Sequence, residues 1–149
     1  GVGAVIFHDL KNDRTNNFDF ALEEVVQFEG ETGPYVQYTH ARAMSILRKA
    51  NHTVDTKEAF SLTDDDAWEV LKLIENYPNV VRFAEEKCEP SAIAKFVINL
   101  AQAFNKYYAH TKVLVEDEAF NSRIALVQTT ASILKQGLAL LGVAAPDEM

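Results

Sequence analysis

Apolar residues recur every three or four positions along most of the chain, which is the spacing of one face of an α-helix. The clearest run begins after Glu89-Pro90, where proline suits the first turn of a helix. Five apolar side chains then share one face: Ile93, Val97, Leu100, Phe104 and Tyr107. The pattern predicts a helix that starts near Pro90 and buries this face.

A second long run has the same spacing. Its members are Ile124, Val127, Ala131, Leu134, Leu138 and Leu141. Gly142 follows where helices commonly end, because glycine readily adopts the left-handed backbone conformation. We expect the two helices to pack against each other along their apolar faces.

Two shorter helices are predicted between these runs and the first part of the chain. Thr63 precedes three aspartates, residues 64–66, a pattern typical of an N-cap with acids in the first turn. The first helix is expected to bury Ala67, Trp68, Leu71 and Ile74. Pro78 should end it after Tyr77, because the residue before a proline is pushed out of the helical conformation. The apolar face of the second helix is expected to carry Val81, Ala84 and Cys88.

Upstream, Gly33-Pro34 precedes a helical pattern that reaches about Ala50. Residues 1–31 are less regular, with helices expected over 4–10 and 22–28 and a polar connection over 11–17. Residues 51–61 are the best candidate for a hinge. These expectations together predict an all-α helical bundle.

Composition supports a folded chain that does not enter a membrane. Its 149 residues are 48% hydrophobic and 24% charged, enough to bury one core. No run of about 18 apolar residues is present to span a bilayer. The single cysteine cannot form an internal disulfide, so a reducing, cytoplasmic compartment is expected.

An evenly spread net charge of -8 would disfavour nucleic-acid partners. The charge is not evenly spread, however. Residues 32–54 and 90–115 contain no Asp or Glu. They carry six bases: Arg42, Arg48, Lys49, Lys95, Lys106 and Lys112. They also hold four of the five tyrosines and three of the four histidines. Cations interleaved with aromatic rings are what a single-stranded nucleic-acid loop requires.

The same residues also fit a non-catalytic helical scaffold or a protein interaction module. Tyrosines on helices are commonly half-buried packing residues, and the basic windows could be solvated faces. Tyr107 falls on the apolar stripe and is expected in the core, whereas Tyr108 is expected at the surface. The two alternatives differ in whether the tyrosines stack on a ligand.

Patterns for catalysis or metal binding are weak. The sequence contains no Glu-x-x-His, His-Glu-x-x-His or Cys-x-x-Cys, the usual di-iron and zinc signatures. Cys88 with His40 or His110 could be drawn as a nucleophile pair, but a lone cysteine on an apolar helix face is usually inert. We therefore expect no catalytic residues, no metal site and no cofactor in this chain.

One stretch is specific enough to suggest a family. Residues 28–42 read Phe-Glu-Gly-Glu-Thr-Gly-Pro-Tyr-Val-Gln-Tyr-Thr-His-Ala-Arg, which resembles arginyl-tRNA synthetase, a class I aminoacyl-tRNA synthetase. The similarity continues over residues 4–10, 89–91, 101–108, 123–126 and 140–149, essentially the whole chain. In that family the final helical domain, the DALR domain, binds the anticodon stem and loop. The resemblance implies that residues 1–31 connect to a catalytic domain and that residues 32–149 form the anticodon-binding domain.

The resemblance also implies site residues. Tyr38, Tyr108 and Met149 match positions that family members place against the anticodon. Four further candidates lie beside those aromatics in the sequence: Arg42, Asn105, His110 and Lys112. The family commonly ends in Pro-Glu-Arg-Met, whereas residues 146–149 read Pro-Asp-Glu-Met, which places an acid where a base is usual.

The implied parent enzyme is an arginine-tRNA ligase, which uses ATP with Mg²⁺ to attach arginine to its tRNA. The sequences that handle ATP, resembling His-Ile-Gly-His and Lys-Met-Ser-Lys-Ser, are absent from this chain. Amino-acid activation therefore belongs to another part of such an enzyme. The expected partner is the tRNA for arginine, with no DNA and no membrane, and a monomer is expected.

Overall fold

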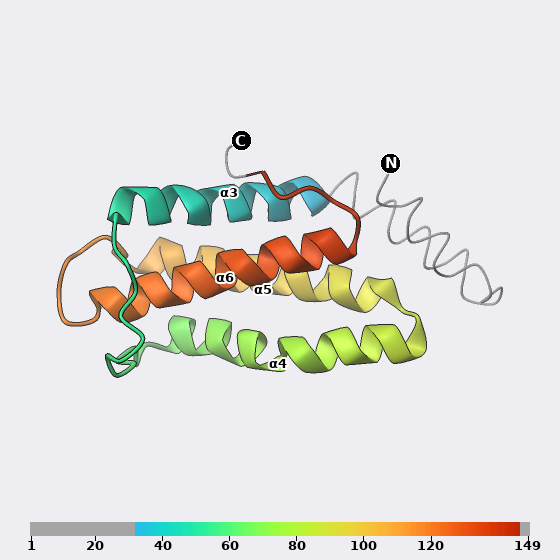
Figure 1. Ribbon diagram of the computed structural model, residues 1–149, viewed down its shortest axis with the longest axis horizontal. Helices are drawn as coiled ribbons and strands as arrows, with labels where there is room; N and C mark the ends of the chain where they lie inside the picture. Colours follow the sequence, from blue (N-terminus) through green and yellow to red (C-terminus); the bar gives the residue numbers. More distant parts are fainter. Residues whose placement is uncertain (1–31, 147–149) are drawn as a thin grey trace.

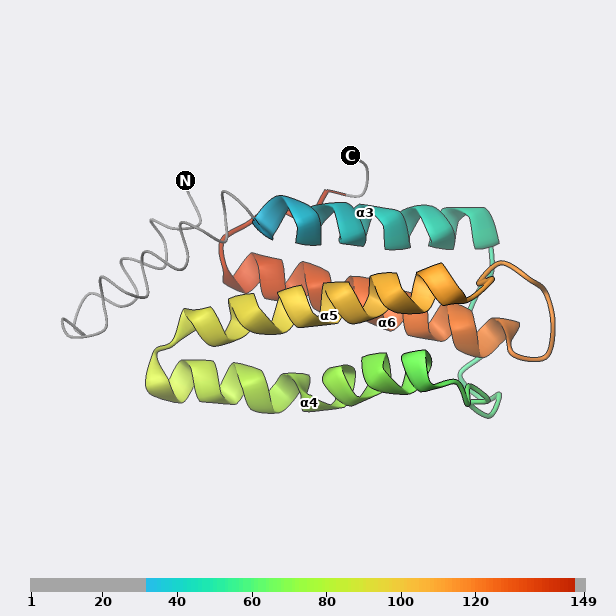
Figure 2. The same cartoon turned by 180° about the vertical axis from the view of Figure 1, so that it is seen from behind.

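Four helices make up the part of the chain that the computed structural model describes, residues 32–146. They are α3 (Gly33–Ala50), α4 (Asp65–Lys87), α5 (Pro90–His110) and α6 (Phe120–Leu140). Figures 1 and 2 show the helices lying side by side, with α3 and α4 at opposite edges and α5 and α6 between them. Over these residues the predicted all-α helical bundle is confirmed.

The core lies along α5 and α6, as their apolar periodicity predicts. Leu100, Phe104 and Tyr107 of α5 are completely buried, as are Ile124 and Leu134 of α6. Each such side chain contributes roughly 1.5–3 kcal/mol by leaving water. The helix end at Gly142 is also confirmed: its φ is 71°, in the left-handed region, and its N–H donates to the carbonyl of Ala139 at 2.9 Å.

Gly137 lets α5 and α6 approach closely. A Cβ at this position would meet Val97 Cγ1 of α5 closer than two carbon atoms can lie. We expect Gly137→Ala to lower the free energy of unfolding by about 1 kcal/mol, since overpacking of roughly 1–3 kcal/mol outweighs alanine's gain of about 1 in helix propensity. Urea denaturation followed by circular dichroism measures this change.

The control for Gly137→Ala is the double variant Gly137→Ala/Val97→Ala, which removes the clashing methyl group. The double variant should lose less stability than the sum of the two single variants. Additive losses would contradict a clash between these two side chains.

Helix α4 differs from its prediction at its start and at its proline. Its N-cap is Asp64, one residue later than the expected Thr63, and Asp64 Oδ2 accepts a hydrogen bond from the Ala67 N–H at 3.1 Å. The expected break at Tyr77-Pro78 is wrong, because α4 continues through Pro78 to Lys87. Pro78 costs about 3 kcal/mol in a helix interior, but Tyr77 packs on Phe96 of α5 with ring centroids 5.3 Å apart. Packing against the bundle therefore offsets the missing backbone hydrogen bond.

Trp68 is 57% exposed, so its predicted burial is wrong. The buried residues of α4 are Ala67, Val70 and Ala84, and Trp68 lies about 100° around the helix from Ala67. Cys88, expected on the apolar face, is the C-cap residue directly after Lys87, with a left-handed φ of 52°. Most of the predicted face is otherwise confirmed, because Ala67 and Ala84 are buried and Leu71 and Ile74 pack against the core.

The connection between α3 and α4 is hydrogen-bonded to α6, whereas a hinge requires a segment that can change its backbone conformation. Asn121 Oδ1 accepts the backbone N–H of Asp55 at 2.8 Å, and Asn121 Nδ2 donates to the Asp55 carbonyl at 3.0 Å. Ser122 Oγ accepts the backbone N–H of Ser61 at 3.0 Å. Asn121 and Ser122 are buried, so the expected hinge over residues 51–61 is replaced by a held loop.

The connection between α5 and α6 is organised by Arg123. This side chain is 7% exposed, and its Nε donates to the Val113 carbonyl at 3.2 Å. Its Nη2 donates to the Val115 carbonyl and to Asp117 Oδ1 at 2.6 Å. The hydrogen bond from Arg123 holds the pKa of Asp117 below its ordinary value of 3.8.

The lowered pKa of Asp117 gives a pH-dependent prediction. A carboxyl whose folded pKa is lowered stabilises the fold above its unfolded pKa, and this contribution is lost as the pH falls through the folded value. We expect Asp117→Asn to reduce stability at pH 7, and the difference from the unchanged chain to shrink as the pH falls below the ordinary value of 3.8 and through the lowered folded pKa. Urea midpoints across this pH range test it, and a pH-independent difference would contradict it.

Several predictions lie outside the described residues. They are the helices expected over 4–10 and 22–28, the connector over 1–31, and Met149. Within residues 32–146, each helix is too short or too polar to cross a bilayer. The same residues hold no group of three or more His, Cys, Asp or Glu that could bind a metal ion.

Candidate nucleic-acid interface

Helices α3 and α5 bring four of the predicted site residues into one cluster. The Arg42 guanidinium carbon lies 5.2 Å from the centroid of the Tyr38 ring and 5.3 Å from that of the Tyr108 ring. Arg42 Nη1 also donates a hydrogen bond to Asn105 Oδ1 at 2.8 Å. At these distances a cation is attracted to the faces of both rings.

Helical spacing explains why these residues meet. Tyr38 and Arg42 are four residues apart on α3, and Asn105 and Tyr108 are three apart on α5, so each pair lies on one helix face. The two faces come together because α3 packs against α5. Tyr38 is 50% exposed and Tyr108 39%, whereas Tyr107 is completely buried. The predicted difference between Tyr107 in the core and Tyr108 at the surface is therefore confirmed.

Tyr35 also belongs to this cluster, although it was not among the predicted site residues. Its hydroxyl accepts a hydrogen bond from Asn105 Nδ2 at 2.8 Å, and its side chain is 39% exposed. It precedes Tyr38 by three residues, so the i, i+3 spacing of two tyrosines was a signal that could have found it. From here on the tyrosine–arginine cluster means Tyr35, Tyr38, Arg42, Asn105 and Tyr108.

His110 does not join the cluster. Its Nδ1 lies 2.8 Å from Asp66 Oδ2 of α4. Lys106 of α5 also faces α4, with its Nζ 3.7 Å from Asp66 Oδ1 and 3.6 Å from Glu69 Oε2. A window without acids in the sequence is therefore not free of acids in space, and part of its positive charge is neutralised by α4.

Two candidates remain, Lys112 and Met149. Lys112 is exposed just beyond the end of α5, and Met149 lies outside the described residues. The segment that leads toward Met149 is attached to α3 as far as Pro146. Gln37 Nε2 donates to the Ala144 carbonyl at 2.7 Å, and His40 Nδ1 lies 3.1 Å from the Pro146 carbonyl.

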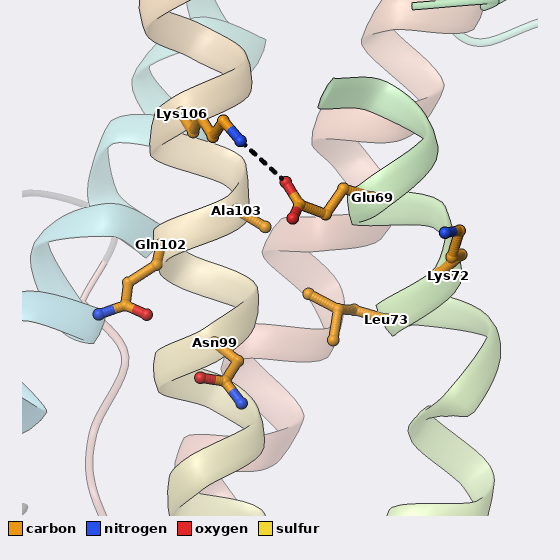
Figure 3. Close-up of a pocket in the computed structure, with 7 residues that line it drawn as sticks. All are labelled: Glu69, Lys72, Leu73, Asn99, Gln102, Ala103 and Lys106. Atoms are coloured by element: carbon orange, nitrogen blue, oxygen red, sulfur yellow. Dashed lines mark ion pairs between the residues drawn. The ribbon is translucent and has the colours of Figure 1, made fainter. Parts of the chain in front are cut away.

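A cleft of about 420 Å³ opens between α4 and α5 (Figure 3). Its lining residues are Glu69, Lys72, Leu73, Asn99, Gln102, Ala103 and Lys106. Figure 3 shows Lys106 and Glu69 pointing toward each other across the gap. Because Lys106 is paired with Asp66 and Glu69 of α4, this cleft offers less free positive charge for a phosphate backbone.

The tyrosine–arginine cluster, by contrast, combines three exposed rings with a cation. Tyrosine rings offer flat faces for unstacked bases, and a guanidinium can meet a phosphate or stack on a base. The cluster contains no carboxylate. Its chemistry suits an unpaired nucleic-acid loop better than a small metabolite or a metal ion.

Comparison with known proteins agrees with this chemistry. Residues 36–149 match the family described as the DALR anticodon binding domain. The arginine–tRNA ligase of Enterococcus faecalis is 66% identical over the whole chain, and that of Latilactobacillus sakei is 58% identical. The chain spans 26% of the length of each of these relatives.

Solved structures show the same similarity. Thermus thermophilus arginyl-tRNA synthetase superposes with a TM-score of 0.72 and 36% identity, over 86% of this chain and 23% of that one. Arginyl-tRNA synthetase of Plasmodium falciparum gives a TM-score of 0.70 and 25% identity, over 99% of this chain and 26% of that one. The chain therefore belongs to the DALR anticodon binding domain family, and it is homologous to one region of the arginine–tRNA ligases.

Proposed function

We propose that this chain binds the anticodon stem-loop of the tRNA for arginine, as one domain of an arginine–tRNA ligase. The observation that carries the proposal is the Arg42 guanidinium held between the exposed rings of Tyr38 and Tyr108. Family membership supports the same function. In the parent enzyme this contact would help to select the correct tRNA.

The residues of the cluster take different parts. Tyr38 and Tyr108 stack on unpaired bases of the loop, and Arg42 meets the phosphate backbone beside them. Lys112 and Met149 are proposed as further contacts with the stem-loop. His110 is proposed as a weaker RNA contact, because its ring faces Asp66.

The chemistry of the parent enzyme belongs to a part that this chain does not include. We propose that ATP, Mg²⁺ and arginine bind in a separate catalytic domain, where arginine is esterified to the terminal ribose of the tRNA. A monomer in the cytoplasm is proposed, in keeping with the unpaired Cys88. The isolated chain should bind RNA weakly, because contacts with the rest of the tRNA are missing.

The direct test is a titration of the chain with the arginine anticodon stem-loop. A hairpin with the same stem and an unrelated loop is the matched control. We expect tighter binding of the arginine hairpin, and a logarithmic salt slope of about 0.7–0.9 for each phosphate contact. Equal binding of the two hairpins at low salt would refute loop recognition and favour a scaffold or a protein interaction module.

A further inference from the structure

Asn105 uses its polar atoms almost entirely within the protein. Its Oδ1 accepts a hydrogen bond from Arg42 Nη1 at 2.8 Å. Its Nδ2 donates to the Tyr35 hydroxyl at 2.8 Å and to Thr39 Oγ1 at 2.9 Å. A side-chain amide has two N–H donors, so both are occupied. Asn105 is therefore poorly equipped to read the edge of a base, although it lies among exposed tyrosines.

The partners of Asn105 are themselves fixed. Thr39 is completely buried, and its hydroxyl donates to the Tyr35 carbonyl at 2.9 Å. Asn105 is thus anchored from the α3 side through Thr39 and Tyr35. Its carbonyl oxygen is held at one place, which is where the Arg42 guanidinium binds.

Arg42 needs such an anchor. A long arginine side chain samples many rotamers when nothing holds it. Attraction to the two rings is weakly directional and permits sliding, whereas a hydrogen bond to Asn105 defines the position of the guanidinium. The anchor is a neutral amide, so it fixes Arg42 without cancelling the positive charge that phosphates would meet.

We propose that Asn105 is a positioning residue, which holds the Arg42 guanidinium between the Tyr38 and Tyr108 rings in the free protein and does not itself contact RNA. The part that concerns RNA rests on the proposed function. Because Arg42 is ordered beforehand, the loop meets a formed platform, and the entropy of ordering this side chain is not lost on binding.

The first experiment needs no RNA. In the ¹⁵N-labelled chain, the Nε–H resonance of Arg42, assigned by its loss in Arg42→Ala, should be displaced by the ring currents of the two tyrosines. Asn105→Ala should move this resonance toward that of an exposed arginine. Asn105→Asp should keep it displaced, because the carboxylate pairs with the guanidinium and can accept a hydrogen bond from the Tyr35 hydroxyl in place of the lost Nδ2–H donors. Asn99→Ala is the matched control, since Asn99 is exposed elsewhere on α5.

An Arg42 resonance that stays displaced in Asn105→Ala would overturn the positioning role. So would a resonance that shifts equally in Asn99→Ala. A change confined to Asn105→Ala and restored in Asn105→Asp supports the role, because general destabilisation of α5 would not be reversed by the carboxylate.

The second experiment is a double-mutant cycle on binding of the arginine anticodon stem-loop. Asn105→Ala should weaken binding roughly threefold to tenfold, the cost of ordering one long side chain. In the Arg42→Ala background the same change should have less than about a twofold effect, because Asn105 acts through Arg42. Equal effects in both backgrounds would mean that Asn105 contacts RNA directly, and would overturn the proposal.

Asn105→Asp separates position from charge. It should keep Arg42 between the rings yet weaken RNA binding, since the carboxylate offsets the guanidinium charge. If the resonance responds as expected while neither Arg42→Ala nor Asn105→Ala alters RNA affinity, positioning of Arg42 stands and the proposed RNA function fails.

Discussion

Arg123→Met is expected to lower the free energy of unfolding by about 3 kcal/mol, because hydrogen bonds to a charged group are each worth roughly 1.5–3 kcal/mol and are not additive. The guanidinium is buried and donates to two backbone carbonyls and to Asp117. Methionine fills a similar volume but offers no donor to the Val113 and Val115 carbonyls, and it leaves Asp117 Oδ1 with only the Ala119 N–H. Urea denaturation followed by circular dichroism measures the loss.

Two comparisons show whether the loss comes from these hydrogen bonds. Arg82→Met changes an exposed arginine of α4 and should alter stability by less than about 0.5 kcal/mol. Arg123→Lys keeps the charge but lacks the planar fork of donors, so it should give an intermediate loss. A loss in Arg123→Met no greater than that in Arg82→Met would contradict the structural role of Arg123.

Tyr38→Ala and Tyr108→Ala are each expected to weaken binding of the arginine anticodon stem-loop roughly fivefold to 150-fold. This range corresponds to about 1–3 kcal/mol for each stacked base. The rings are 50% and 39% exposed, so truncating them should change the fold little. Fluorescence anisotropy of a labelled hairpin measures the affinity, and circular dichroism checks the helix content.

Trp68→Ala is the matched control for the tyrosine variants. Trp68 is also an exposed aromatic residue, at 57%, but it lies on α4 and outside the tyrosine–arginine cluster. Its truncation should leave RNA affinity unchanged, whereas Tyr38→Phe and Tyr108→Phe should retain most of it because the ring remains. If neither tyrosine variant weakens binding more than Trp68→Ala does, stacking on these rings is ruled out, and the scaffold alternative gains support.

The helix predictions were correct where a single apolar face of the helix packs into the core. The stripe from Ile93 to Tyr107 is buried as its spacing indicated. The prediction failed on α4, because local rules about proline and tryptophan were outweighed by packing. Pro78 stays inside a helix that is held by contacts such as Tyr77 with Phe96, and none of these contacts can be read from neighbouring residues.

The candidate site was predictable only in part. Tyr38, Arg42, Asn105 and Tyr108 do come together, and resemblance to a known family had indicated the two tyrosines. His110, chosen because it is near Tyr108 in the sequence, turns toward Asp66 instead. Proximity along a helix does not define a common face, since each residue is rotated by about 100° from the one before.

The sequence by itself determined the helical class, the buried stripes of α5 and α6, and the presence of tyrosines and bases in two stretches without acids, because periodicity and composition are properties of the chain. The tertiary structure decided which charges remain available. By packing α4 against α5 it pairs Lys106 with Asp66 and Glu69, and by packing α3 against α5 it places Arg42 between two rings beside a neutral amide. Coulomb interactions depend on distance in space rather than along the chain, so only the folded arrangement separates a neutralised lysine from a cation that can meet RNA.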